Sequence, residues 1–362
     1  MAYAQAQFSD SSYRLIEIFC RANDLRLPSN LRPDNPAEIC DLLHYRTLLR
    51  LVSRLLPERR NALAHFGRYP RTLKVPADLE SQNSVVNSTQ PPTRGVDAHC
   101  HADRFLSKCG KNTMEQAIAL APPTDYVLLS CVSNYCFPEE WPRLESNGFA
   151  FEGRNLVRTI GIHPSRASSY RDADVEHLKR LIRSPSCVGV GEIGLDFYRC
   201  TNVDGQLRQK SLFVRLVSVA VQAGKPIVLH CREAHAQTLH LVKRYMRPGT
   251  HKIHIHCFSA GLSELRDWLS FPGAVIGIGP TLLPSPNGKR LLRPAREVLA
   301  AIPLDRLVLE SDSPFLPVGG ESPDFSPTTI SQVAKKVAQA KGVSWSEVMN
   351  ISAQNALNFY SY

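Results

Sequence analysis

The stretch GVDAHCHADRF, residues 95–105, places two histidines one residue apart behind a short apolar run. Side chains at positions i and i+2 of a β-strand point to the same side. If this stretch is a strand, the imidazoles of His99 and His101 therefore enter one space, where they could bind a metal ion. The alternative is a pair of surface histidines beside a turn, because short motifs of this kind often occur by chance.

Ionisable residues also lie at the ends of four later apolar runs. The runs VGVGEIGLD, IVLHCRE, IHIHCFS and LVLESDSPFL carry, in that order, Glu192, His230, His256 and Asp312. A single buried charge is usually paired within the core. Six ionisable side chains at corresponding ends of successive strands are better explained by a shared cation, because a desolvated ionisable group needs a partner.

The donor set predicts the kind of metal. Four imidazoles and two carboxylates suit divalent zinc, manganese, iron or nickel better than calcium. Six protein ligands exceed the three that a single catalytic zinc commonly uses, so two ions about 3.5–4 Å apart account better for the number. Glu192 is the candidate bridging ligand, because its strand lies between the two groups of histidines. Two-metal sites favour displacement at phosphorus.

The elements that must position these residues follow a regular pattern. Short apolar, β-branched runs recur from Gly95 onward, and amphipathic helical patterns lie between several of them. Strands that alternate with helices indicate parallel βα units. Eight such units over residues 95–362 predict a (β/α)8 TIM barrel, which typically takes about 250 residues. The carboxyl ends of the strands carry the chemistry of such barrels, and the six ionisable residues fall there.

The chain before the barrel has a different texture. Residues 1–80 show apolar residues at helical spacing, with Asn35 and Pro36 as a helix-start signal, and predict a small helical appendage. Residues 81–94 are polar, contain proline and lack acidic side chains, which predicts a linker. The predicted catalytic domain is therefore 95–362.

Composition narrows the class of protein. The chain of 362 residues is 43% hydrophobic and 21% charged, as in globular proteins that bury a core. No apolar run approaches the roughly 18 residues of a membrane span, and the N-terminus has no signal-peptide pattern, so we expect no membrane partner. Ten cysteines without a CxxC pair favour reduced thiols in an intracellular protein, nuclear or cytoplasmic. The net charge of +10 suits a phosphate-rich partner.

Taken together, the motifs DAHCHADRF, GIHP, VGVGEIGLDFYR, KPIVLHCREA, HIHCFSAG and LESDSPFL resemble those of the TatD-type metal-dependent deoxyribonucleases, which are amidohydrolase-like TIM barrels. The resemblance covers residues 95–362, and the long N-terminal segment is similar to that of animal TatD-domain proteins with an N-terminal extension. It implies a hydrolase with two divalent cations (magnesium, manganese or zinc) that cleaves phosphodiester bonds of DNA exonucleolytically, with RNA as an open alternative. The GxHPH motif of the family reads GIHPS here, with Ser165 in place of the second histidine.

The resemblance also implies how the ligands divide between the two ions. The first ion would be held by His99, His101, Glu192 and Asp312. The second ion would be held by Glu192, His230 and His256.

Roles for individual residues follow as hypotheses. Asp312 and Glu192 are the candidate catalytic residues. Asp312 would orient and deprotonate the attacking water, or it would serve as a metal ligand only. The candidate substrate contacts are His163, Arg199 and Arg232, because they lie at or near strand ends and arginine binds phosphate bidentately. The alternatives are a histidine bonded to the backbone and surface ion pairs.

Two rival functions stay open. An amidohydrolase acting on a small cyclic amide or ester often carries a modified lysine on the fourth strand, where this chain has Glu192 and no lysine. A catalytically silent nucleic-acid-binding scaffold would be expected to have lost ligands.

Asp97 is predicted to orient its neighbours, and His254 to be structural.

Overall fold

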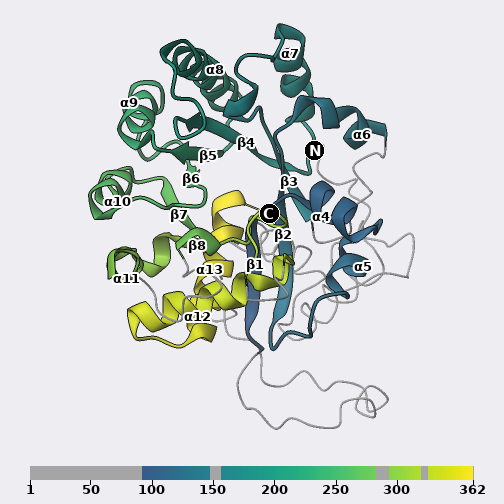
Figure 1. The fold of residues 1–362 in the computed structure, drawn as a ribbon, viewed down its shortest axis with the longest axis vertical. Coiled ribbons are helices and arrows are strands. Elements are labelled where there is room, and N and C mark those ends of the chain that lie inside the picture. Colours follow the sequence, from purple (N-terminus) through teal and green to yellow (C-terminus); the bar gives the residue numbers. More distant parts are fainter. Residues whose placement is uncertain (1–91, 147–155, 283–292, 319–324, 362) are drawn as a thin grey trace, which may run out of the picture. The chain divides into compact units, whose positions relative to one another are not determined.

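The computed structural model describes residues 92–146, 156–282, 293–318 and 325–361. Its eight strands are parallel and follow one another in one sheet in the order β1 to β8, with helices between them (Figure 1). The predicted (β/α)8 barrel is therefore confirmed. The predicted helical appendage, 1–80, and residues 81–91 of the predicted linker lie outside the described residues.

The strands and helices alternate along the chain, apart from two helix pairs. The strands are β1 (Arg94–Cys100), β2 (Val127–Tyr135), β3 (Leu156–Ile160), β4 (Cys187–Asp196), β5 (Ile227–Arg232), β6 (Ile253–Ile255), β7 (Ala274–Ile278) and β8 (Leu307–Leu309). The helices are α4 (Ala102–Cys109), α5 (Met114–Ile118), α6 (Trp141–Ser146), α7 (Asp172–Leu181), α8 (Val203–Gln222), α9 (His235–Tyr245), α10 (Leu262–Leu269), α11 (Arg293–Ala301), α12 (Ile330–Lys341) and α13 (Trp345–Tyr360).

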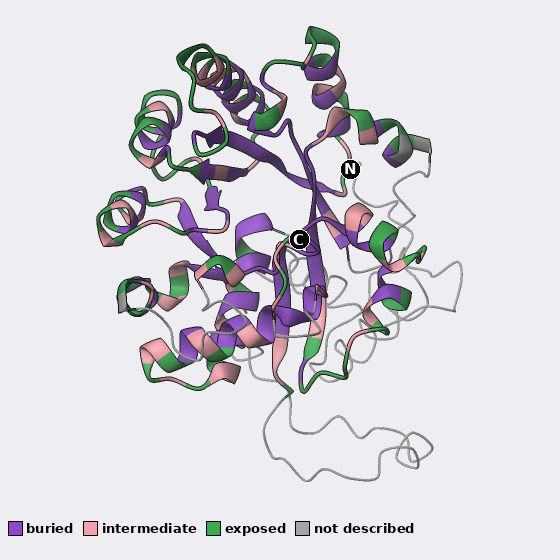
Figure 2. Ribbon diagram, in the orientation of Figure 1, coloured by how far each residue is buried: buried purple, intermediate pink, exposed green. Residues whose placement is uncertain are grey.

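The outer helices follow from local sequence rules. In α8, the Asn202 side chain accepts a hydrogen bond from the backbone N–H of Gly205 and so caps the helix start. The same helix buries Leu212, Phe213 and Leu216, which share one face at helical spacing. Figure 2 shows buried strands and helices that are buried mainly on the side facing the sheet. Within the described part of the chain, no helix combines the length and apolarity needed to cross a membrane.

The amino-terminal end of the barrel is filled by apolar side chains. Inward-facing valines of several strands form one cluster with the end of α13, where Phe359 and Tyr360 are buried. Helix α13 is anchored there by the side chain of Asn355, which donates to the carbonyl oxygens of Leu304 and Leu307, each at 2.7 Å. Lys252 Nζ also donates to the last carbonyls of this helix. The floor of the barrel is therefore a fixed, packed layer.

The barrel closes between β1 and the chain that follows β8. The backbone N–H of Asp312 donates to the carbonyl oxygen of His99 at 3.0 Å, and that of His101 donates to Ser313 at 2.8 Å. These bonds bring the end of the last strand against the first. Closure therefore sets Asp312 directly beside the two histidines of the HxH pair.

Candidate metal centre

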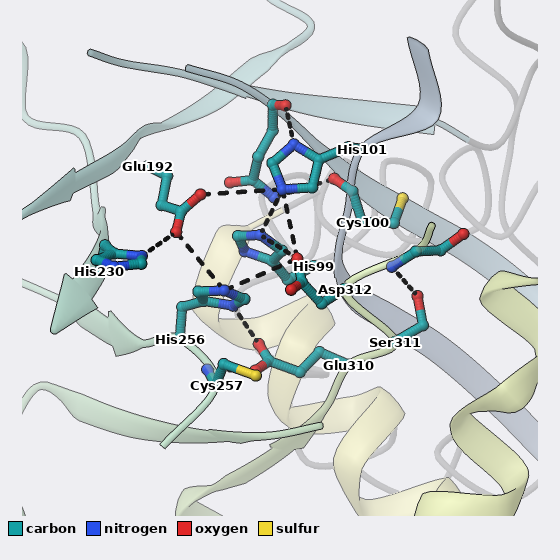
Figure 3. Close-up of polar contacts among 12 residues, drawn as sticks. His99, Cys100, His101, Glu192, His230, His256, Cys257, Glu310, Ser311 and Asp312 are labelled. Atoms are coloured by element: carbon teal, nitrogen blue, oxygen red, sulfur yellow. Dashed lines mark hydrogen bonds and ion pairs between the residues drawn. The ribbon is translucent and has the colours of Figure 1, made fainter. Parts of the chain in front are cut away.

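Figure 3 shows one close group of side chains at the carboxyl ends of the strands. It contains the six residues predicted as metal ligands: His99, His101, Glu192, His230, His256 and Asp312. In its first part, the Nε2 atoms of His99 and His101 lie 3.3 Å apart. Oδ1 of Asp312 lies 3.6 Å from the first nitrogen and 3.4 Å from the second. The two rings enter one space, as the i, i+2 spacing predicts.

Glu192 occupies the middle of the group. Its Oε1 lies 2.5 Å from Nδ1 of His230 and 3.6 Å from Nε2 of His256. Its Oε2 lies 3.9 Å from Nε2 of His101. This carboxylate thus lies beside imidazoles of both predicted ligand sets, and its bridging role stays a prediction.

His256 contacts both parts of the group. Its Nε2 lies 3.9 Å from Oδ1 of Asp312, and its ring stacks on that of His99 with centroids 3.5 Å apart. The predicted second ligand set, with Glu192 and His230, is therefore not spatially separate from the first. Which ion each side chain holds stays a prediction.

The protonation pattern fits a cation. Nδ1 of His101 lies 3.0 Å from the carbonyl oxygen of Asn134, which can only accept, so this nitrogen carries the proton. Nε2 of the neutral ring then presents a lone pair to the carboxylates of Asp312 and Glu192. An unshared pair beside two negative groups is repulsive unless a cation or a proton lies between them. The residues present therefore fit divalent metal ions.

Electrostatics in the metal-free group follow the same logic. Burial raises the pKa of Glu192, but the neighbouring His256 and His230 outweigh it, so the pKa lies well below its usual value. Burial lowers the pKa of His256, but the charges of Glu310 and Glu192 outweigh it and raise the pKa to about 10. Burial, with His256 alongside, holds the pKa of His99 well below its usual value. Protons on some of these rings thus take the place of metal charge.

The predicted substrate contacts line the pocket above this group, which has a volume of about 990 Å³. The ring of His163 lies 4.6 Å from that of His230, between centroids, and its Nδ1 lies 2.8 Å from the hydroxyl of Ser165. Burial lowers the pKa of His163 to about 3, so the ring is neutral at pH 7. The serine that replaces the second histidine of the GxHPH motif therefore orients the first.

The two predicted arginines lie on the pocket wall. The guanidinium carbon of Arg232 lies 3.9 Å from the centroid of the exposed ring of Tyr198. The backbone N–H of Arg199 donates to Asp196 at 2.9 Å. Phe315 also lines the pocket, is 51% exposed and packs edge-on against His101 at 4.9 Å between centroids. Aromatic and cationic side chains therefore surround the candidate metal centre.

Sequence reasoning missed Glu310, which is fully buried beneath the candidate ligands. Its Oε2 lies 3.2 Å from Nδ1 of His256, and its Oε1 accepts from the backbone N–H of Cys257. The signal was present, because Glu310 precedes Asp312 by two residues, as His99 precedes His101. Asp97 accepts from the backbone of His99 and from the hydroxyl of Ser311 at 2.5 Å, which are contacts expected of an orienting residue.

Comparisons with known proteins show what the chain is similar to. The family described as TatD related DNase matches residues 96–361. The human "3'-5' RNA nuclease TATDN2" is 32% identical over 234 residues, which are 61% of this chain and 29% of that protein. The "3'-5' ssDNA/RNA exonuclease TatD" of Edwardsiella piscicida is 39% identical over 160 residues, 44% of this chain and 58% of that protein. The chain thus spans less than two thirds of the length of both relatives.

Other matches extend over nearly the whole of the related protein. The "Uncharacterized metal-dependent hydrolase YcfH" of Escherichia coli (strain K12) is 30% identical over 267 residues, 72% of this chain and 93% of that protein. The crystal structure of YJJV, a TatD homologue from Escherichia coli, aligns with a TM-score of 0.60 at 24% identity, covering 75% of this chain and 99% of that one. This structural likeness supports the barrel fold.

Proposed function

The chain belongs to the TatD-related DNase family, and on that premise we propose that it is a metal-dependent nuclease. It would hydrolyse phosphodiester bonds of DNA and RNA exonucleolytically, from the 3' end. The polarity and both substrates follow the names of the human and Edwardsiella relatives. The likeness to a metal-dependent hydrolase, together with the clusters of potential ligands, supports the use of divalent metal.

One observation carries the proposal. The four imidazoles and two carboxylates of the predicted ligands, from the ends of β1, β4, β5, β6 and β8, face one another in one close group at the base of the pocket. We assign two cations to them, magnesium, manganese or zinc, with Glu192 between the two. Such cations, when bound, act as Lewis acids on phosphate oxygens and lower the pKa of water.

The remaining chemistry falls to the chain's own side chains. The side chain of Asp312 keeps 13% exposure, against 5% for Glu192, whose oxygens are both occupied by histidines. Asp312 is therefore better placed to meet a water molecule in the pocket and to accept its proton. Neutral His163 is placed to contact the substrate near His230.

The pocket rim supports a nucleic acid with unpaired bases. Tyr198 and Phe315 are large exposed aromatic side chains, and bases stack on such rings. Arg199 and Arg232 line the same pocket and offer hydrogen bonds to phosphates. We infer that the terminal nucleotides of a single strand bind between these side chains.

The two rival functions gain no support from these features. The fourth strand presents Glu192 rather than a lysine, which the amidohydrolase alternative would use. A silent scaffold would not need the complete set of facing ligands. An intracellular location remains part of the proposal, supported by the free thiols of all cysteines in the described ranges.

The test is digestion of end-labelled single- and double-stranded DNA and RNA by the purified full chain. We expect shortening from the 3' end that stops in EDTA and returns with Mn²⁺ or Mg²⁺. Cleavage that persists after chelation would contradict the metal requirement. Metal binding without any phosphodiester cleavage would favour the amidohydrolase, and neither would favour the scaffold.

A further inference from the structure

A line of buried polar side chains connects the C-terminal helix with the candidate metal centre. The hydroxyl of Tyr360, at the end of α13, lies 2.7 Å from Nδ1 of His254 on β6. Nε2 of His254 lies 3.0 Å from Oε2 of Glu310, and the same oxygen lies 3.2 Å from Nδ1 of His256. Figure 3 shows the last of these contacts, with Glu310 turned toward His256 and away from Glu192.

Acceptors and donors along this line fix the protons that face Glu310. Since a carboxylate only accepts, Nδ1 of His256 carries a proton toward Glu310, and Nε2 of His254 does the same. The second contact is off the axis of a linear hydrogen bond, so its attraction is mainly electrostatic. Nδ1 of His254 then faces the hydroxyl of Tyr360, which also lies 3.5 Å from the carbonyl oxygen of Ala98. Nε2 of His256 is left facing Glu192 and Asp312, and its lone pair becomes available to a metal when the ring loses its second proton.

The neighbouring strand leaves room for this arrangement. Gly277 on β7 has no side chain where a Cβ atom would lie 2.4 Å from Nε2 of His254 and 2.5 Å from Oε2 of Glu310. Both approaches are too close for a real Cβ atom. Any larger residue at this position would therefore push the two partners apart.

We propose that Glu310, His254 and Tyr360 are positioning residues, which hold His256 in its Nδ1-protonated form and so couple metal affinity to the placement of the C-terminal helix. This inference rests on the proposed function, because it treats His256 as a metal ligand. It assigns a role to His254 beyond the structural one expected from the sequence. Partners of this kind change metal affinity by about 10- to 100-fold when they are removed.

The end of α13 is fixed well enough to serve as the anchor. The backbone N–H of Leu309 on β8 donates to the hydroxyl of Ser352 at 2.7 Å, and Lys252 Nζ donates to the carbonyl oxygens of Asn358 and Phe359. These bonds tie β8, and the residue directly before β6, to the same helix. The Tyr360 hydroxyl therefore has a defined position relative to His254.

The test compares Mn²⁺ affinity of the full chain and its variants by isothermal titration calorimetry at one pH. We expect Glu310→Gln to weaken binding about 10- to 100-fold. Tyr360→Phe should weaken it about threefold, because it removes a single hydrogen bond that lies further from the ligand His256. Gly277→Ala, which removes no polar atom, should weaken it as well. The matched control is Tyr126→Phe, which also loses a buried hydroxyl contact, to the carbonyl oxygen of Thr328 at 3.0 Å.

A double-mutant cycle separates positioning from mere stabilisation of the fold. If the line acts as a unit, Tyr360→Phe has no further effect on Mn²⁺ affinity in the Glu310→Gln background. Additive effects, or a Tyr360→Phe variant that binds like the Tyr126→Phe control, would overturn the inference. Should Glu310→Gln fail to fold, nitrogen-15 shifts of the imidazoles decide: wild type must show His256 protonated at Nδ1, and Tyr360→Phe must shift the His254 signals.

The outcomes also distinguish this inference from the function on which it rests. A wild-type chain that binds Mn²⁺, with variants that bind it equally well, would remove the positioning role and leave the nuclease proposal intact. A wild-type chain that binds no divalent metal would remove both.

Discussion

The two ends of the barrel interior are equally buried but built from opposite chemistry. At the amino-terminal end, valines such as Val228 and Val308 pack against α13 with 0% exposure. At the carboxyl end, the exposed fractions of His99 and Glu192 are 0% and 4%. Burial of apolar surface stabilises a fold by about 25 cal/mol per Å². Burial of ionisable groups costs free energy, which the pairing of histidines with carboxylates offsets.

The difference separates stability from function. The interior is apolar at the amino-terminal ends of the strands and carries the candidate ligands at their carboxyl ends, and the Glu310–His254 contact forms a polar layer in between. The amino-terminal end should hold the barrel together whether or not metal is present. The carboxyl end should be stabilised most by a bound cation. Each prediction below changes one end and asks whether the other responds.

The largest effect is expected from removal of a central carboxylate. Glu192→Ala and Asp312→Ala should each lower nuclease activity by about 1,000-fold or more, because a catalytic cation supplies several kcal/mol of transition-state stabilisation. Circular dichroism should show an unchanged fold. The control is Asp267→Ala, which removes an exposed carboxylate on α10. Wild-type cleavage by either variant, in a preparation free of other nucleases, would contradict the assignment.

At the opposite end, Val228→Ala should destabilise the fold without touching the site. Loss of two buried carbons, with the cavity left behind, costs about 1.5–3 kcal/mol of the free energy of unfolding. Urea denaturation measures this loss, and Mn²⁺ affinity should fall no further than in Tyr360→Phe, because the hydrogen bonds that fix α13 are retained. Val203→Ala, at a position with 70% exposure, is the control. A large loss of metal affinity in the Val228 variant would show that the two ends are not independent.

The aromatic rim is expected to act on substrate alone. Phe315→Ala should raise KM for a single-stranded oligonucleotide about tenfold, since one stacked base contributes about 1–3 kcal/mol. Tyr198→Ala should act similarly, and it leaves the contact between Phe315 and His101 in place. Tyr245→Ala removes an exposed ring of α9 and serves as control. An unchanged KM for both rim variants would contradict the stacking hypothesis.

The smallest effect concerns protons. Because the pKa of His256 in the metal-free protein is raised to about 10, this ring is charged at pH 7.5 and must lose its proton to bind metal. Mn²⁺ binding should therefore release at least the proton of His256, and the raised pKa values of His101 and His230 act in the same direction, so affinity should increase with pH up to about 10. Calorimetry in Hepes and in Tris, which differ in ionisation heat, measures the release. Equal binding heats in the two buffers would contradict it.

Much of the fold and of the candidate site could be predicted because periodicity carries the information. Apolar runs of strand length separated by helical patterns define the barrel, and an ionisable residue at the end of such a run stands out, as His230 does after IVL. The i, i+2 rule also placed His99 and His101 together. Their roles as ligands stay predictions.

The remainder depends on one weak local signal, that of Glu310, and on three-dimensional features that no local pattern contains. Glu310 lies inside the last run, one inward position below Asp312, so it looked like part of the strand rather than of the site. The link from His254 to Tyr360 joins residues 106 positions apart. The need for Gly277 arises only once β6, β7 and β8 lie side by side.

The most direct test of the account is anomalous diffraction from crystals of the full chain grown with Mn²⁺. The account predicts two anomalous peaks in the pocket, both within ligand distance of Glu192, one toward His99 and His101 and the other toward His230. A single peak that leaves Glu192 uncoordinated, or no peak among these side chains, would contradict the claim that they share a pair of cations.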